Sequence, residues 1–185
     1  MTSQSFDESY FKSGAYAEVS FDRYSQYWWS NRFYAILCRR YGPRQGRVLE
    51  IGSGLGHLLE WLVDRYAVFG TDINPWALAQ AKKNVSKGNF VLLSAEDLAA
   101  FPDSCFQIVI AKHVVEHLSN PEKAISEMSR VLASGGLLLL ATPNLDSASR
   151  IIKKDRWIGY KDSTHISLKP PSEWLKSLNS FHALG

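Results

Sequence analysis

Short apolar runs and helical repeats alternate along most of this chain. The runs that fit buried strands are Arg47–Ile51, Ala67–Thr71, Phe90–Leu93, Gln107–Ala111 and Gly136–Ala141. Apolar positions at helical spacing between them predict helices over Gly56–Tyr66, Pro75–Val85 and Pro121–Leu132. Strands that alternate with helices build a parallel sheet with helices on both faces. The pattern therefore predicts an α/β fold with a doubly wound parallel sheet.

The two ends of the chain depart from this alternation. Residues 1–45 are rich in aromatic side chains and include a predicted helix, Tyr27–Tyr41. We expect this part to form a cap over the mouth of a ligand site, either as a lid or as a stripe packed on the core. Residues 46–145 form the predicted core, and residues 146–185 a substrate-side loop and helix, the helix spanning Pro171–Leu178.

A glycine-rich turn follows the first predicted strand. Val48–Ile51 runs directly into Gly52-Ser53-Gly54-Leu55-Gly56. A phosphate-binding P-loop would need Lys and then Ser or Thr after its last glycine, where this chain has His57 and Leu58. The dinucleotide fingerprint would need its third glycine at His57. The spacing Glu50-x-Gly52-x-Gly54-x-Gly56 instead resembles motif I of the class I S-adenosylmethionine (SAM)-dependent methyltransferases.

An acidic residue ends the second predicted strand. Asp72 lies twenty residues after Gly52, and Asn74-Pro75 then cap and start a helix. The resemblance implies that Asp72, with the adjoining Ile73, holds the ribose of SAM. A plain reading makes the glycines a turn and Asp72 a surface residue before a cap. The order strand, glycine turn, helix, strand and acid favours the cofactor.

Two later segments narrow the resemblance. Ser94-Ala95-Glu96-Asp97-Leu98 and the stretch Phe106–His117, followed by Ser119-Asn120-Pro121, resemble the type 11, type 12 and ubiquinone-biosynthesis O-methyltransferases. The resemblance covers about Gly46 to Pro143, with an echo at Asp162-Ser163-Thr164-His165. Ser94 and Gln107 depart from it, because relatives often have an acid there.

The resemblance also assigns cofactor contacts. It implies that Glu96, Asp97 and Leu98 hold the adenine, that Lys112 and His113 line the methionine moiety, and that Arg32 reaches the cofactor carboxylate. The cofactor contacts implied by the glycine turn are Glu50, Gly52, Ser53, Gly54 and Gly56.

The chemistry implied is methyl transfer from SAM to a small-molecule acceptor, at oxygen in the first place, with S-adenosylhomocysteine as product. Alignment and desolvation supply most of the acceleration of such a displacement. A hydroxyl acceptor would benefit from a base, and His113 is our candidate, with His165 as the alternative. The alternative function is a non-catalytic or truncated SAM-binding protein that acts through a partner.

A metal site is a further possibility raised by spacing. His113, Glu116 and His117 stand at i, i+3 and i+4, so a helix would bring them to one face. The other reading is that Glu116 and His117 orient the turn at residues 118–120. We favour the second reading and predict no metal.

Composition limits the cellular compartment and the kinds of partner that we expect for the chain. The chain has 185 residues, 45% of them hydrophobic and 21% charged, a net charge of +3 and two cysteines. These values predict a cytoplasmic protein with no membrane span and no nucleic-acid partner. The resembled fold closes with an antiparallel strand pair, and we expect this pair to be missing here. We therefore expect the Gly136–Ala141 edge to be covered by the segment after Pro143 or by a second chain in a homodimer.

Overall fold

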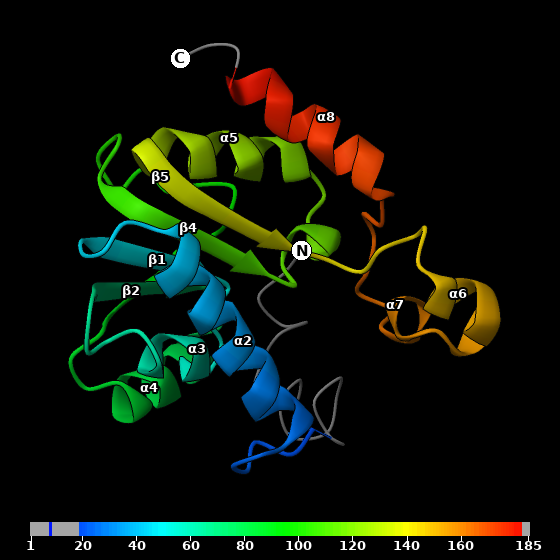
Figure 1. Ribbon diagram of the computed structural model, residues 1–185, viewed down its shortest axis with the longest axis horizontal. Helices are drawn as coiled ribbons and strands as arrows, with labels where there is room; N and C mark the ends of the chain where they lie inside the picture. Colours follow the sequence, from blue (N-terminus) through cyan, green and yellow to red (C-terminus); the bar gives the residue numbers. More distant parts are fainter. Residues whose placement is uncertain (1–7, 9–18, 183–185) are drawn as a thin grey trace.

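The computed structural model describes Glu8 and residues 19–182, and it contains a five-stranded parallel sheet (Figure 1). The strand order is β3-β2-β1-β4-β5. The strands are β1 (Arg47–Ile51), β2 (Ala67–Asp72), β3 (Asn89–Leu92), β4 (Phe106–Lys112) and β5 (Leu132–Ala141). This order is that of a doubly wound sheet and confirms the predicted fold class.

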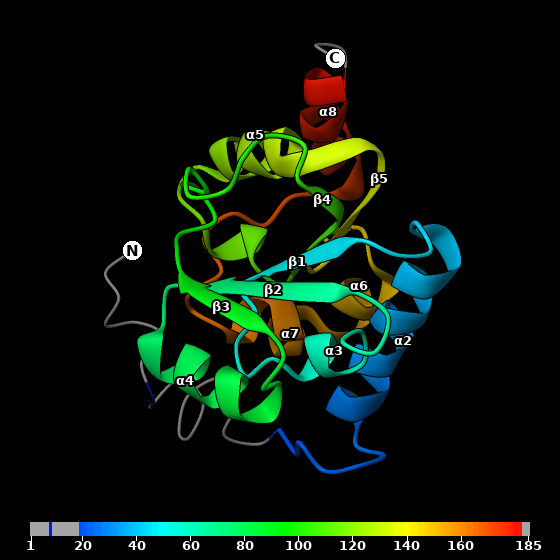
Figure 2. The same ribbon diagram turned by 90° about the vertical axis from the view of Figure 1, so that its left-hand side faces the viewer.

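The two central strands, β1 and β4, are buried on both faces because helices cover both. On one face, Leu49 and Val109 pack with apolar side chains of α5 (Pro121–Val131) and with Trp174 of α8 (Pro171–His182). On the other face, Val48 and Ile108 pack with α2 (Gln26–Tyr41) and α3 (His57–Glu60). Figure 2, viewed from the side, shows the sheet between these two layers, with α4 (Pro75–Asn84) on the second.

Short polar side chains fix where the helices begin. Asn74 accepts a hydrogen bond from the Ala77 N–H at the start of α4, and Asn120 does the same for Lys123 at the start of α5. Each asparagine is followed by a proline in the first helical turn. These are the helix starts predicted from the Asn-Pro pairs.

Three elements differ from the predicted bounds by four residues or more, and one of them is α8, which extends to His182 instead of Leu178. The helix predicted over Gly56–Tyr66 ends at Glu60, because the N–H groups of Trp61 and Leu62 bond to carbonyls three residues back and tighten the chain into turns. Strand β5 begins at Leu132, directly after α5, and the pairing between β4 and β5 shifts register between Phe106 and Ile108. The glycines before Leu137 accommodate this irregularity.

After β5 the chain leaves the sheet. Figure 1 shows α6 (Ala148–Lys153) and α7 (Ile158–Lys161) beyond the carboxyl ends of the strands; the short helix η3 (Lys154–Arg156) joins them. The chain then returns as α8, which packs on α5. We call residues 142–170 the excursion. It is tied back by the N–H groups of Ile166 and Ser167, which both donate to the Glu116 carbonyl.

Strand β5 forms one edge of the sheet. Among residues 19–182, no strand follows β5 and none pairs with its outer side. The expected loss of the antiparallel pair is therefore seen in this part of the chain, and α8 contacts α5 instead of covering the β5 edge. The described helices include none that is long and apolar enough to cross a membrane.

Candidate functional site

A cavity of about 360 Å³ lies at the carboxyl ends of the strands. It opens between β1 and β4, where the strand order reverses direction, which is the position where open α/β sheets bind ligands. Its walls come from the glycine turn after β1, the ends of β2 and β4, the loop after β3, and Tyr27 and Asn31 of α2. The fold thus brings together segments that are up to about ninety residues apart in sequence.

The glycine turn needs a backbone that other residues rarely adopt. Gly52, Gly54 and Gly56 have φ angles of 65°, 50° and 78°, in the left-handed region. A Cβ atom on Gly52 would lie 2.5 Å from Cγ2 of Val114 in the loop after β4. The turn therefore packs closely against that loop and exposes its backbone to the cavity.

Asp72 holds the glycine turn in place. Its two carboxylate oxygens accept hydrogen bonds from the Gly54 N–H (2.8 Å) and the Asn74 N–H (2.9 Å). Burial raises the pKa of Asp72, and these N–H donors oppose the rise. Each carboxylate oxygen has two lone pairs, so the side chain keeps capacity for a further donor in the cavity.

Glu50 and Lys112 face the cavity from the two central strands. Glu50 is 5% exposed, and its Oε2 has no hydrogen-bond partner in the part of the chain that the structure describes. Burial raises the pKa of Glu50 to about 8, and the positive charge of Lys112 opposes the rise. The Lys112 ammonium donates to Oδ1 of Asn31 at 2.7 Å and lies about 5 Å from the rings of Tyr27 and Tyr34. Burial lowers the pKa of Lys112.

His113 occupies the first position after β4 in an unusual conformation. Its φ is 57°, and its N–H donates to the Ala141 carbonyl at 2.8 Å. The Nδ1 atom lies 3.2 Å from Oε1 of the fully buried Glu116, while about half of the His113 side chain is exposed. The strand end and β5 thus fix the imidazole at the cavity wall.

A second hollow of about 670 Å³ adjoins the first. Its lining comes from residues between Val19 and Ser30 and from Lys112 and His113. Tyr27, Lys112 and His113 line both hollows. Part of the aromatic-rich region therefore lines a hollow beside the cavity, and its role as a cap stays a prediction. The parts of that region in residues 1–7 and 9–18 lie outside the described residues.

Most of the predicted site residues line the first cavity, namely Glu50, Gly52, Ser53, Gly54, Asp72, Ile73, Glu96, Lys112 and His113. Four do not: Arg32, Gly56, Asp97 and Leu98. Arg32 instead lies over the rings of Trp28, Trp29 and Trp61, and the Leu98 side chain is fully buried in the core. As cofactor contacts these four remain predictions without a place in the cavity.

Sequence reasoning missed Asn31 and Val114 as lining residues. Asn31 is 2% exposed and stands four positions after Tyr27, so the helical repeat that placed Tyr27 could have indicated it. His117, Leu118 and Ser119 also line the cavity, although the sequence analysis placed none of them at the cofactor site.

The cavity wall includes polar side chains with atoms that have no hydrogen-bond partner among the described residues. Oε2 of Glu50, Oγ of Ser53 and Nδ2 of Asn31 are buried, and none has a hydrogen bond within the described residues. An unpaired buried polar atom costs about 1–3 kcal/mol. A ligand that carries an ammonium group, hydroxyl groups and a carboxylate would provide hydrogen-bond partners for these three atoms. SAM carries all three kinds of group.

Comparison with known proteins agrees with the methyltransferase resemblance of the sequence motifs. The family model described as "Methyltransferase domain" matches residues 49–140. Phosphatidylethanolamine N-methyltransferase of Cereibacter sphaeroides is 36% identical over 103 residues, 52% of this chain and 50% of that protein. Ubiquinone biosynthesis O-methyltransferase of Thiobacillus denitrificans is 29% identical over 111 residues, 57% of this chain and 48% of that protein.

Solved structures agree in fold. A SAM-dependent methyltransferase from Archaeoglobus fulgidus superposes with a TM-score of 0.68 at 25% identity, over 82% of this chain and 68% of that one. The YcgJ protein of Bacillus subtilis gives a TM-score of 0.69 at 24% identity, over 82% and 67%. The chain spans about half the length of the two curated relatives described above.

Proposed function

The chain belongs to the class I SAM-dependent methyltransferases, and from that premise we propose that it transfers a methyl group from SAM to a small-molecule acceptor. SAM is the cofactor of this family. The observation that carries the proposal is the cavity at the strand ends, where Glu50 and Asp72 meet the glycine turn. The curated relatives include both N- and O-methyltransferases, so similarity to them does not identify the atom that is methylated.

The chemistry of the walls suggests how SAM would be held. Asp72 would accept hydrogen bonds from the ribose hydroxyls. Glu50, whose Oε2 is unpaired, would accept from the α-ammonium group, and Lys112 would donate to the α-carboxylate. The two buried charges of the protein would then each meet the opposite charge of the ligand, which offsets the cost of burying them. Glu96 also lines the cavity and would contact the adenine, and Ile73 would lie beside the ribose.

SAM supplies a methyl group on a positively charged sulfur, which an acceptor displaces in line. The residues of the chain would align the acceptor and exclude water. We propose oxygen as the acceptor atom and His113 as the base that takes its proton, because His113 borders both hollows and keeps half of its side chain exposed. His165 suits that role less well, since its side chain is only 9% exposed and its Nδ1 is bonded to the Gly159 carbonyl.

The cellular compartment of the protein and its binding partners are also proposals. Cys38 and Cys105 are free thiols, in keeping with a reducing cytoplasm. The basic side chains are not gathered into a run, so we propose no nucleic-acid partner. The unpaired edge of β5 supports association of two chains.

Calorimetric titration with SAM, followed by a screen of acceptors for S-adenosylhomocysteine formation, tests the function. We expect a dissociation constant in the micromolar range, about −8 kcal/mol, and turnover with a hydroxyl acceptor. A chain that does not bind SAM would refute the proposal. Binding without turnover for any hydroxyl, amine or carbon acceptor would favour the non-catalytic alternative.

A further inference from the structure

Glu116 is a fully buried acid in the short helix η2 (Val115–His117), which follows the end of β4. Its backbone carbonyl accepts hydrogen bonds from the N–H groups of Ile166 and Ser167, both at 2.9 Å. These two residues belong to the excursion. The excursion therefore holds the backbone of Glu116 in place at the end of β4.

The carboxylate of Glu116 faces the imidazole of His113. Oε1 lies 3.2 Å from Nδ1 of His113, and Oε2 has no hydrogen-bond partner among the described residues. A carboxylate oxygen only accepts hydrogen bonds, so Nδ1 of His113 carries the hydrogen of this contact. A buried carboxylate with few donors is costly, and that cost favours this tautomer strongly. A neutral His113 therefore has its lone pair on Nε2.

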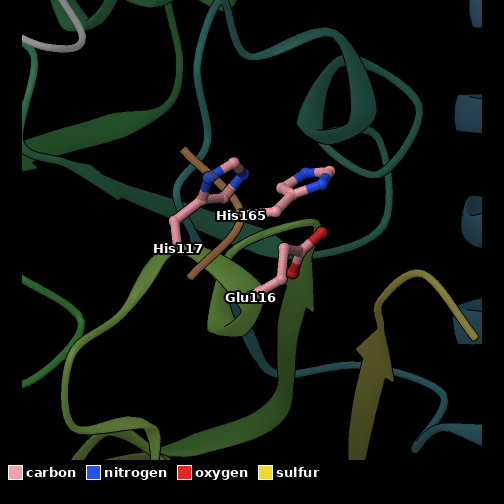
Figure 3. A group of neighbouring side chains, drawn as sticks. All are labelled: Glu116, His117 and His165. Atoms are coloured by element: carbon pink, nitrogen blue, oxygen red, sulfur yellow. The ribbon is translucent and has the colours of Figure 1, made fainter. Parts of the chain in front are cut away.

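Two further imidazoles, those of His117 and His165, lie on the carboxylate side of Glu116 (Figure 3). Their ring centroids are 4.8 Å apart, and the Nδ1 atom of each ring lies within 2.8 Å of an oxygen atom of the excursion. Both side chains are largely buried, whereas about half of the His113 side chain is exposed. His113 is therefore the imidazole that Glu116 can present to a ligand.

The backbone of His113 fixes the direction of its ring. Its φ of 57° lies in the left-handed region, and the bond from its N–H to the Ala141 carbonyl holds this conformation. Backbone strain of this kind gathers at functional sites. With Nδ1 turned towards the buried Glu116, Nε2 is left on the side of the ring that borders the two hollows.

We propose that Glu116 is the positioning residue of the base: it holds His113 in the Nδ1–H tautomer and offsets the charge that the ring gains. This inference rests on the proposed function, in which His113 is the base. Nε2 takes the proton of the acceptor hydroxyl while the hydroxyl oxygen bonds to the methyl carbon and the carbon–sulfur bond breaks. The ring then carries the positive charge that the sulfur loses, until it releases the proton to solvent. The carboxylate, 3.2 Å away, stabilises this imidazolium as the acid of a Ser-His-Asp triad does.

The surroundings of Glu116 strengthen this interaction. Burial and the negative charge of Glu116 both raise the pKa of Tyr34 on α2. Burial lowers the pKa of His117, and the charge of Glu116 opposes that change. Within the described residues no lysine or arginine forms an ion pair with Glu116, and its printed charge partner is His113. The attraction between carboxylate and imidazolium is thus weakly screened, as expected away from bulk water.

Nitrogen NMR of the ligand-free full-length chain, labelled with ¹⁵N-histidine, tests the tautomer. At a pH where the ring is neutral, protonated and unprotonated ring nitrogens give separate signals, and loss of the signals in His113→Gln assigns them. We expect the Nδ1–H form in the parent. Its share should fall in Glu116→Met, which keeps the size of the side chain but offers no carboxylate. Circular dichroism verifies that the variant is folded.

Kinetics with the acceptor found in the screen test the role in the reaction. Glu116→Gln keeps the shape of the side chain but removes its charge, so kcat should fall about tenfold or more, up to the roughly 10²–10⁴-fold that a general base contributes. The dissociation constant for SAM should stay within about twofold, because Glu116 does not line the cavity. A merely structural role would lower the melting temperature without changing the tautomer of His113.

Glu60→Gln is the matched control, because Glu60 faces His57 at 3.8 Å with the same spacing of three residues. It should change neither the His113 signals nor kcat. Three results would overturn the proposal: a parent in which neutral His113 carries its proton on Nε2, an unchanged tautomer in Glu116→Met, and an unchanged kcat in Glu116→Gln. An equal loss of kcat in Glu60→Gln would also overturn it.

The tautomer is measured without SAM or an acceptor, so its outcome is separate from that of the proposed function. A parent that neither binds SAM nor methylates any acceptor would contradict the proposed function, whichever tautomer His113 adopts.

Discussion

Replacement of Asp72 by asparagine separates its two roles. In the structure its oxygens accept from the N–H groups of Gly54 and Asn74, at 2.8 and 2.9 Å. Asp72→Asn keeps the shape but turns one acceptor into an NH₂ group, which faces one of these donors. A hydrogen bond to a charged group is worth about 1.5–3 kcal/mol. At about 2–4 °C per kcal/mol, the melting temperature without ligand should fall by about 3–12 °C.

Asp72→Asn should also weaken SAM binding, and by more than its effect on the stability of the fold accounts for. If the carboxylate also accepts from the ribose, a second loss of about 1.5–3 kcal/mol lowers the affinity about ten- to a hundredfold. Differential scanning fluorimetry and calorimetry on the same sample measure both effects. Asp64→Asn is the control, because Asp64 is exposed and pairs with Arg39 at the surface, where such pairs contribute little.

The two measurements can each refute part of the reasoning. A lower melting temperature with an unchanged dissociation constant for SAM would restrict Asp72 to holding the glycine turn. An unchanged melting temperature would mean that the bonds to Gly54 and Asn74 do not support the fold.

Further predictions concern three other features. Gly54→Val should abolish SAM binding but keep the circular dichroism spectrum, because φ at Gly54 is 50° and the turn borders the cavity; retained affinity would contradict this. Burial raises the pKa of Glu50 from 4.5 to about 8, so the folded state keeps a proton that the unfolded chain releases. The ligand-free protein should therefore lose stability as pH rises through that window, and Glu50→Gln should flatten the thermal-melting profile; equal profiles would refute the burial argument. Amides of Leu137–Leu140 at the free edge of β5 should exchange more slowly at higher protein concentration, and fast exchange at every concentration would contradict a dimer.

The sequence predicted the sheet well because its signals are local. β1 has the predicted bounds, Arg47–Ile51, since an apolar run between a turn and a glycine can form little else. α6 and α7 were not predicted, because their residues are largely exposed and show no helical stripe of buried side chains. The excursion that carries them is tied to the turn after β4 through Ile166 and Ser167, and no periodicity reveals these contacts.

Residues of the candidate site could be predicted where a charged residue stands at the end of a predicted strand. Glu50, Asp72 and Lys112 all stand at carboxyl ends of predicted strands, and parallel strands bring such ends together. Leu98 shows the limit of this reasoning. An apolar residue in a loop can pack in the core or line a cavity, and the Leu98 side chain is buried in the core. His165 was noted only as an alternative base, and its approach to His117 depends on the path of the whole excursion.

The left-handed backbone of His113 has a consequence for engineering. A side chain at φ 57° costs roughly 1–2 kcal/mol relative to glycine, and nothing in the sheet requires an imidazole at this point. A sequence designed for stability alone would place Gly or Asn at this position. His113→Gly would relieve this strain, but it would also remove the imidazole that lies 3.2 Å from Oε1 of the buried Glu116 and the ring that borders both hollows. Automated stabilisation of this scaffold would remove the side chain on which its chemistry is proposed to depend.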